Sequence, residues 1–384
     1  MDFVSIFNNF KEQSIAGRYI HLEHIEPLLL HDNRKRNTTI IGYSVLAKPI
    51  YKYVVGTGKI KVLMWSQMHG NESTTTKAVF DLFNFLDSNH DFATFIKNTY
   101  TICIVPMLNP DGAEMYTREN ANAVDLNRDA QDLSQPESRV LRNLFQDFVP
   151  NYCYNLHDQR TIYGVGDTNL PATVSFLAPA YNEAREFDDS RNTAISVICH
   201  LNKELQNHIP AQVGRYDDSF NANCVGDTFQ MFGVPTILFE AGHYQNDYQR
   251  EETRKFIFIA LLSAFEAMNK SLLGDDIFNN YLSIPLNKTS FLDIIYKNIS
   301  INYDNTILSL NFAAQFSERI VNFDVEFSAI IEKIDNLENT FGHLEYDFEN
   351  AFLENNDLNC VKIGQIATFK FNNGIKFVNG LMIL

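Results

Sequence analysis

Four side chains that suit metal-dependent catalysis stand directly after predicted strands. His69 and Glu72 follow one apolar run, His157 follows a second, and Glu240 follows a third. Because open α/β sheets place their functional groups at the carboxyl ends of strands, we expect these side chains at one edge of a sheet. Two histidines and a glutamate form a three-ligand zinc site with one position left for water. The sequence therefore predicts a zinc centre, although Glu72 alone would equally suit an acid at a helix N-terminus.

Two further features suit hydrolysis at such a centre: a separate carboxylate and an arginine-containing loop. Zinc acidifies water to a pKa of about 7 and polarises a carbonyl group. A carboxylate outside the ligand set, Glu240, can take that proton and pass it to a leaving amine. The polar loop 117–129 contains Arg118, Asn127 and Arg128, a composition typical of anion recognition. For either arginine alone, an ordinary surface salt bridge is the alternative.

The elements that position these residues alternate between strand and helix. Strands are predicted near 60–65, 100–105, 152–156 and 234–239, and helices near 74–87, 134–148, 183–208 and 250–273. Beyond residue 284 short β-patterned runs take over, with a hairpin signal at Asn372-Asn373-Gly374. We expect a catalytic domain at 1–275, a boundary near 275–283, and a small β-rich domain of unknown role at 284–384.

Composition limits the classes of partner. The formal net charge of −16 argues against binding to nucleic acid or to anionic membranes, because both favour basic surfaces. The five cysteines are widely spaced without a Cys-x-x-Cys pair, which predicts free thiols and a reducing compartment. The sequence contains no run of eighteen apolar residues and no leader-like N-terminus. These features predict a cytoplasmic protein without a membrane partner, and they leave the oligomeric state open.

In their order along the chain, these residues resemble the zinc metallocarboxypeptidases, the carboxypeptidase A/B-like family. The matching elements are His69-x-x-Glu72, Asn109-Pro-Asp-Gly112 (predicted as a turn), Arg118, Asp125-x-Asn127-Arg128, His157 and Phe239-Glu240. A lone His-x-x-Glu would be weak evidence, whereas six elements in family order are specific. The resemblance implies an α/β fold with a mixed, twisted sheet flanked by helices, followed in this chain by the small β-rich domain.

The resemblance also implies a role for each matching residue. The implied ligands of one zinc ion per chain are His69, Glu72 and His157. Arg118 would polarise the carbonyl of the scissile bond. Asn127 and Arg128 would hold the free carboxylate of the substrate. Glu240 would act first as general base and then as general acid.

Three features depart from the digestive members of that family. The tyrosine that closes over substrate there has no secure counterpart, and Tyr216, taken as a substrate-binding candidate, and Tyr244 are the options. Asp158 follows the third ligand, where a small hydroxyl residue is common. The stretch around Gly226-Asp227 shows no clear basic, acidic or aromatic determinant, so the sequence leaves the preferred C-terminal residue open.

Three functions fit these observations. The expected one is a zinc-dependent metallocarboxypeptidase that hydrolyses the C-terminal peptide or peptide-like amide bond of a substrate with a free carboxylate, cell-wall-type peptides included. The alternative is an N-acyl-amino-acid deacylase of the succinylglutamate desuccinylase/aspartoacylase type, which shares the His-Gly-Asn-Glu and Asp-Leu-Asn-Arg strings. The Asn-Pro-Asp-Gly string favours the first. A binding module without catalysis would have lost a ligand or the base, and this sequence retains both.

Overall fold

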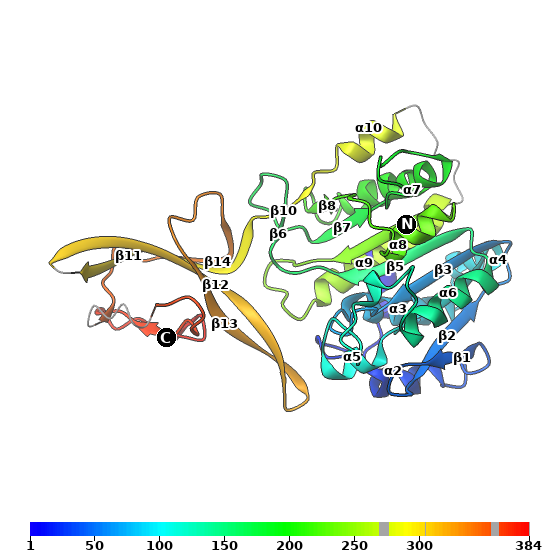
Figure 1. Cartoon of the computed structure of the whole chain (residues 1–384), viewed down its shortest axis with the longest axis horizontal. Helices are drawn as coiled ribbons and strands as arrows, with labels where there is room; N and C mark the ends of the chain where they lie inside the picture. Colours follow the sequence, from blue (N-terminus) through cyan, green and yellow to red (C-terminus); the bar gives the residue numbers. More distant parts are fainter. Residues whose placement is uncertain (269–275, 304, 355–360, 384) are drawn as a thin grey trace. The chain divides into compact units, whose positions relative to one another are not determined.

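The computed structural model describes residues 1–268, 276–303, 305–354 and 361–383 (Figure 1). It divides into two compact units. The first consists of Met1–Gln159 and Ala172–Asn287, and the second of Arg160–Pro171 and Lys288–Leu384. A boundary between two domains was expected at 275–283, and residue 275 lies outside the residues that the structure describes. The grouping of 160–171 with the second unit had no signal in the sequence.

An eight-stranded sheet runs through the first unit in the order β1-β2-β4-β3-β5-β9-β7-β8 (Figure 1). Its strands are β1 (Thr38–Tyr43), β2 (Pro49–Val55), β3 (Ile60–Ser66), β4 (Tyr100–Val105), β5 (Tyr152–Asp158), β7 (Val174–Leu177), β8 (Val213–Arg215) and β9 (Thr236–Ala241). The four central strands β4, β3, β5 and β9 are parallel, whereas β2 and β7 pair with them in the antiparallel sense. The predicted mixed sheet is therefore confirmed.

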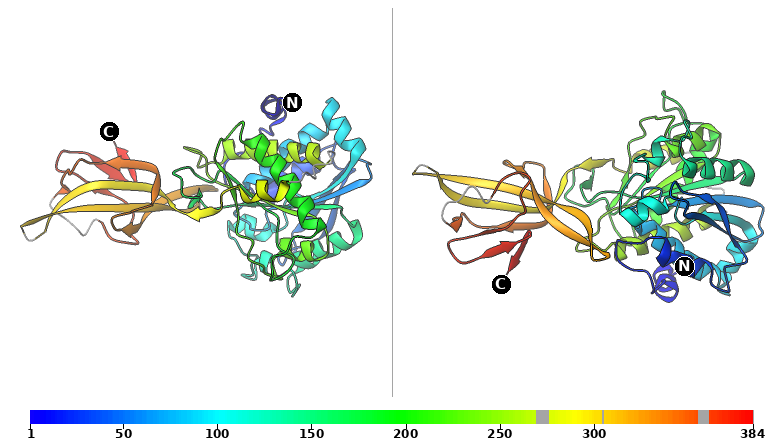
Figure 2. Two further views of the ribbon diagram at one scale, coloured as in Figure 1. Left: turned by 90° about the horizontal axis from the view of Figure 1, so that it is seen from above. Right: turned by 60° about the horizontal axis from the view of Figure 1, so that its bottom comes forward.

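Helices cover both faces of this sheet, as the views in Figure 2 also show. They are α1 (Phe3–Phe10), α2 (Leu22–Leu29), α3 (Thr74–Leu86), α4 (Asp91–Thr99), α5 (Pro110–Met115), the 3-10 helix η1 (Leu126–Arg128), α6 (Pro136–Phe148), α7 (Asp189–Leu205), α8 (Val225–Met231), α9 (Glu251–Met268) and α10 (Ile277–Leu282). None of the helices in the described ranges combines the length and the apolar character that crossing a bilayer requires.

The central strand β3 shows why the sheet is buried on both faces. Val62 and Met64 belong to the core that includes α1, α3, α7 and α9. Leu63 and Trp65 point to the opposite face and pack in the core formed with α6 and α8. Successive side chains of a strand alternate between faces, so a continuous apolar run is what a strand between two helical layers requires.

The predicted turn at Asn109–Gly112 is instead the start of helix α5. The side-chain Oδ1 of Asn109 accepts a hydrogen bond from the N–H of Gly112 at 2.9 Å, and Pro110 occupies the first helical position. An asparagine at such a position stabilises a turn or a helix N-terminus through the same bond. The string alone therefore did not distinguish the two outcomes.

The second unit consists of strands in the described ranges. They are β6 (Tyr163–Val165), β10 (Asn287–Thr289), β11 (Phe291–Tyr303), β12 (Thr306–Val321), β13 (Asp324–Ile334), β14 (Phe341–Asp347), β15 (Phe369–Lys370), β16 (Lys376–Val378) and β17 (Leu381–Ile383). The hairpin predicted at Asn372–Gly374 is confirmed: β15 and β16 pair in the antiparallel sense, and Gly374 has a φ of +91°. Segment 160–171 joins this unit through Thr161 O, which lies 2.7 Å from His343 Nε2.

Candidate active site

The ends of three neighbouring parallel strands bring the metal-type residues and Glu240 together. The chain reaches His69 three residues after β3, and His157 and Glu240 are paired residues on β5 and β9. Adjacent strands lie about 4.8 Å apart, so the carboxyl ends of parallel neighbours share one edge of the sheet. His69, Glu72, His157 and Glu240 are all buried at this edge, with 2–8% of their surface exposed.

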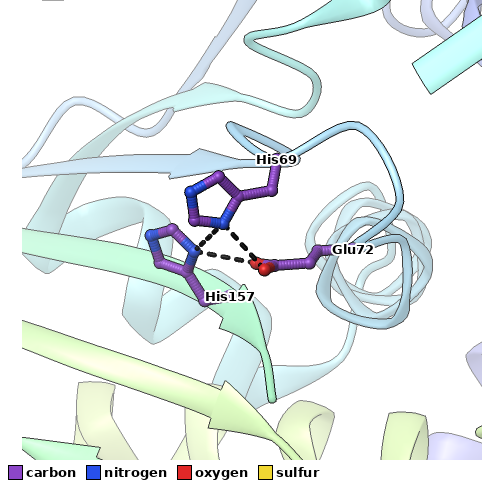
Figure 3. Close-up of side chains that lie close together, drawn as sticks. All are labelled: His69, Glu72 and His157. Carbon is purple, nitrogen blue, oxygen red and sulfur yellow. Dashed lines mark hydrogen bonds and ion pairs between the residues drawn. The ribbon is translucent and has the colours of Figure 1, made fainter. Parts of the chain in front are cut away.

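His69, Glu72 and His157 form a tight cluster (Figure 3). The Nδ1 atoms of the two histidines are 3.2 Å apart, and they lie 2.7 Å and 2.8 Å from the carboxylate oxygens of Glu72. One ligand-type atom from each residue lies within 4.8 Å of the other two. Two ring nitrogens at this separation need a proton or a cation between them. The arrangement therefore suits one bound metal ion.

The outer contacts of the cluster also fit zinc. Nε2 of His69 lies 3.0 Å from Asp125 Oδ1, a contact that places the ring proton on Nε2 and leaves the Nδ1 lone pair facing the cluster. The backbone N–H of Asp158 donates to Glu72 Oε2 at 3.1 Å and so orients that carboxylate. Two imidazole nitrogens and an oriented carboxylate are the donor set expected of a zinc site that keeps one position open.

The carboxylates at the site differ in their electrostatics. Burial raises the pKa of Glu72, but the neighbouring His69 and His157 outweigh it and hold that pKa well below the usual range. Burial raises the pKa of Glu240 well above its usual range, and the carboxylates of Glu72 and Asp158 add to the rise. The Oε2 atom of Glu240 is buried without a hydrogen-bond partner among the described residues. Glu240 is thus a poorly solvated carboxyl group beside, and separate from, the ligand cluster.

Arg118 lies next to the cluster, and its role toward a substrate carbonyl stays a prediction. Its Nη1 is 3.2 Å from His69 Nδ1 and 3.5 Å from Glu72 Oε1. Its Nε and Nη2 donate to Asp125 Oδ2 at 3.1 Å and 3.0 Å. Asp125 therefore binds both His69 and Arg118. In the sequence, Asp125 belonged to one of the matching strings, but no contact was predicted for it. A ligand histidine usually donates its second ring N–H to a carboxylate, and this rule would have pointed to Asp125.

Asn127 and Arg128 lie together in η1, on the loop that precedes α6. The side-chain Oδ1 of Asn127 accepts from the N–H of Val225 at 3.0 Å, which joins this loop to the start of α8. Arg128 is exposed, and its Nη1 donates to Asn127 O at 2.8 Å and lies 3.1 Å from Cys224 Sγ. The guanidinium is thus accessible to solvent, and its role as a carboxylate clamp stays a prediction.

The two candidate tyrosines have different surroundings. Tyr216 is half-buried directly after β8, which lies two strands from β9 at the edge of the sheet. Tyr244 is half-buried, and its ring packs against Phe256 of α9 with centroids 5.5 Å apart. The ring of Tyr244 therefore packs against the hydrophobic core, and the substrate role of either tyrosine stays a prediction.

Residues 30–217 match the family model of the zinc carboxypeptidases. This part of the chain belongs to the zinc carboxypeptidase family. The matched range includes the three residues of the metal-type cluster, Arg118 and the Asn127–Arg128 pair, whereas Glu240 lies beyond it. The family that the sequence resembled is therefore confirmed.

Curated relatives share shorter segments with this chain. It is 29% identical over 100 residues to "Probable carboxypeptidase 2" of Arthroderma benhamiae, a match that covers 26% of this chain and 19% of that protein. It is 30% identical over 103 residues to "Gamma-D-glutamyl-L-diamino acid endopeptidase 1" of Lysinibacillus sphaericus, which covers 23% of this chain and 26% of that protein. The chain thus aligns with well under two thirds of each relative.

Among solved structures, the fold is similar to that of a metallo-carboxypeptidase from Burkholderia cenocepacia. The TM-score is 0.52 at 18% sequence identity, and the match covers 65% of this chain and 69% of that one. At this level of identity the likeness concerns the fold. It confirms the arrangement of a mixed sheet between helical layers.

Proposed function

We propose that the protein is a zinc-dependent metallocarboxypeptidase that hydrolyses the C-terminal peptide or peptide-like amide bond of its substrate. The observation that carries the proposal is the convergence of two Nδ1 atoms and a carboxylate, with Glu240 buried beside them. His69, Glu72 and His157 would hold one zinc ion. When bound, zinc supplies Lewis acidity, which lowers the pKa of water and polarises a carbonyl group.

The protein's own groups would move the proton and stabilise charge. Glu240 would accept a proton from water at Oε2, which has no partner within the part of the chain that the structure describes, and pass it to the leaving amine. Arg118 would hold the carbonyl oxygen of the scissile bond as negative charge develops there. Its Nη1 already lies within 3.5 Å of the cluster, while its other nitrogens are anchored on Asp125.

The position of the cleaved bond would be set by the loop of Asn127 and Arg128. A planar guanidinium and an amide on adjacent residues can bind the two oxygens of one carboxylate. Fixing that carboxylate would place the last peptide bond over the metal, and such positioning contributes much of an enzyme's rate. We keep Tyr216 as a candidate for a further contact with substrate.

The test compares peptides that end in a free carboxylate with the same peptides amidated at the C-terminus. The zinc-loaded enzyme should cleave the free acids, one residue at a time, with kcat/KM about 10²-fold higher than for the amides, since a charged hydrogen bond contributes about 1.5–3 kcal/mol. Arg128→Ala should lower kcat/KM on free acids by a similar factor and change the amides little, as expected for direct contact. Internal cleavage of amidated peptides at full rate would contradict the proposal.

The same assay decides the nature of the substrate. Turnover of small N-acyl amino acids alone would favour the deacylase alternative, which also needs a carboxylate clamp. The relative named as a γ-D-glutamyl-L-diamino acid endopeptidase supports including cell-wall-type peptides in the substrate set. The four cysteines that the structure describes are free, which fits a reducing compartment, and we retain the cytoplasm as the proposed location; Cys360 lies outside the described residues.

A further inference from the structure

Two buried charged residues, Asp158 and Arg250, join the strand ends that carry the site. Neither belongs to the strings that identified the family, and only 7% of Asp158 and 1% of Arg250 is exposed. Burying a charge is costly unless it is hydrogen-bonded, so the bonds that each one makes indicate its purpose.

Asp158 ties His157 to Glu72. It directly follows His157 at the end of β5, and its backbone N–H donates to Glu72 Oε2. Its side-chain carboxylate accepts from the N–H groups of Thr74 at 2.9 Å and Thr75 at 3.3 Å. These are the first residues of α3, whose N–H groups have no partner within the helix. The backbone of Asp158 thus orients the Glu72 carboxylate, and its side chain fixes the helix that begins two residues after Glu72.

The residue in the N-cap position of α3 does not cap this helix with its side chain. Ser73 is in the N-cap position, but its hydroxyl donates to Arg18 O at 2.6 Å, and its side chain makes no capping bond. The start of α3 therefore depends on the carboxylate of Asp158, which lies on strand β5.

Arg250 ties the end of β5 to the end of β9. Its Nη2 donates to Gln159 O at 2.8 Å, and its Nη1 donates to Ala241 O at 2.6 Å and to Gly242 O at 2.5 Å. Gln159 is two residues after His157, and Ala241 directly follows Glu240. The rigid fork of the guanidinium therefore fixes the spacing between a metal-type ligand and the buried carboxylate.

We propose that Asp158 and Arg250 are positioning residues with separate tasks. Asp158 sets the affinity for zinc through its side chain, which fixes the start of α3 and with it the position of Glu72 beside His157. Arg250 sets the turnover rate by holding Glu240 at a fixed distance from the ligands. The second task rests on the proposed function, whereas the first is a statement about metal binding alone.

The first task is tested with zinc alone, by chelator competition on metal-free protein. Asp158→Ala keeps the backbone N–H bond to Glu72 but removes the carboxylate that anchors α3. Because Glu72 directly precedes that helix, the Kd for zinc should rise by about 10–100-fold, the usual cost of losing an outer group that positions a ligand. Asp158→Asn retains one acceptor for the helix N–H groups, so it should raise the Kd less. The visible absorption of bound Co²⁺ should change in Asp158→Ala, because the ligand geometry changes.

The matched control is Asp188→Ala. Asp188 also caps a helix through its carboxylate, accepting from the N–H of Arg191 at 2.8 Å at the start of α7. This change should lower the thermal stability of the metal-free protein and leave the Kd for zinc unchanged. An unchanged Kd in Asp158→Ala, or an equal rise in Asp188→Ala, would overturn the proposal for Asp158.

The second task is tested with Arg250→Lys, which keeps the charge and loses the fork. We expect kcat to fall by about 10²-fold, as for a misplaced catalytic group, with the Kd for zinc unchanged. An unchanged kcat, or a rise in the Kd that matches Asp158→Ala, would overturn the role of Arg250. If the wild-type protein hydrolysed no peptide or amide, the proposed function would fail, yet the zinc measurements on Asp158 would still stand.

Discussion

Two groups of buried charge in the first unit invite comparison: the His69–Glu72–His157 cluster, and the group around Asp81 of α3 and Arg254 of α9. Both groups include fully or nearly fully buried side chains that water would otherwise solvate. They differ in how the charges are matched. The comparison shows which property of a buried cluster marks it as a site.

In the second cluster every charge has a counterpart. Arg254 donates to Asp81 through two nitrogens, at 2.5 Å and 2.7 Å, and its third lies 3.1 Å from Glu251. Lys77 pairs with the same glutamate at 2.6 Å. Lys11 pairs with it as well, at 2.7 Å. Each carboxylate of this cluster is therefore matched by at least one cation, and we call the cluster balanced in this sense; it serves to join α3 to α9.

Around the candidate site the carboxylates are matched by cations only in part. Burial holds the pKa of Glu240 well above its usual range, although Arg118 and Arg250 both act to lower it. Arg118 contacts the carboxylates of Glu72 and Asp125, the side chain of Asp158 accepts from the backbone N–H groups of Thr74 and Thr75, and Oε2 of Glu240 has no partner among the described residues. Negative charge and ring lone pairs therefore collect where one cation would satisfy them. Burial of charge is common to both clusters, whereas this excess marks the site.

The largest effect is expected from His157→Ala, which removes one of the converging lone pairs. The Kd for zinc should rise by more than about 100-fold, since even a change in a group that only orients a ligand costs 10–100-fold. Peptidase activity should fall to background. Thermal unfolding of the metal-free protein should change little, because the large core of this unit does not depend on the metal. Stoichiometric zinc at normal affinity in this variant would remove His157 from the ligand set.

Glu240→Gln should separate the ligands from the proton carrier. The amide keeps the shape of the side chain and cannot accept a proton. We expect kcat to fall by roughly 10²–10⁴ with the Kd for zinc unchanged. Kinetics and chelator titration on the same preparation provide the measurement. A variant with full activity would rule out the role of Glu240.

The sequence predicted the first cluster because its members have chemically distinctive types at recurring places. His69, His157 and Glu240 each follow an apolar run, and such a pattern is visible without a structure. The balanced cluster offered no such signal, because Asp81 and Arg254 are 173 residues apart. Each of these two residues also lies within a helix whose pattern is explained by packing alone.

The same reasoning explains what else the sequence did not indicate. In the sequence, Asp158 was visible only as a departure from the family. Its carboxylate caps α3 from strand β5, and a cap from a distant segment leaves no local pattern near Thr74. The carboxylate clamp of Asn127 and Arg128 came from the resemblance, and its test is kinetic. The fold class was predictable because apolar periodicity reports on burial, which is what the two helical layers create.

Asp81→Asn should show that the balanced cluster serves stability alone. It removes the carboxylate that two nitrogens of the buried Arg254 contact and leaves that guanidinium with its longer carboxylate contact to Glu251, a change that costs about 3–5 kcal/mol of unfolding free energy. The Kd for zinc should not change. Urea unfolding and chelator titration measure the two quantities. As a control, Asp32→Asn, which breaks an exposed pair with Lys35, should cost less than about 1 kcal/mol. A weakened zinc site in Asp81→Asn would mean that the clusters are coupled.

The smallest predicted effect concerns Glu251 and depends on pH. Burial raises the pKa of Glu251, but Lys77, Lys11 and Arg254 outweigh it and lower that pKa to about 2, from an ordinary value of 4.5. A carboxyl group whose pKa is lower in the folded protein than in the unfolded chain stabilises the fold above the unfolded value. That contribution is lost as the pH falls from 4.5 toward 2.

Glu251→Gln should therefore lower the unfolding free energy of the metal-free protein by about 2 kcal/mol at pH 7, a figure reduced from the full linkage value because the side chain is a quarter exposed. The difference between wild type and variant should shrink as the pH falls below 4.5, because protonation removes the same charge from the wild type. Urea unfolding at pH 7 and at pH 3 measures it. A difference that stayed constant with pH would show that packing, not charge, makes Glu251 stabilising. It would also weaken the contrast between the Asp81–Arg254 cluster, whose carboxylates are matched by cations of the protein, and the candidate site, where a bound cation would match them.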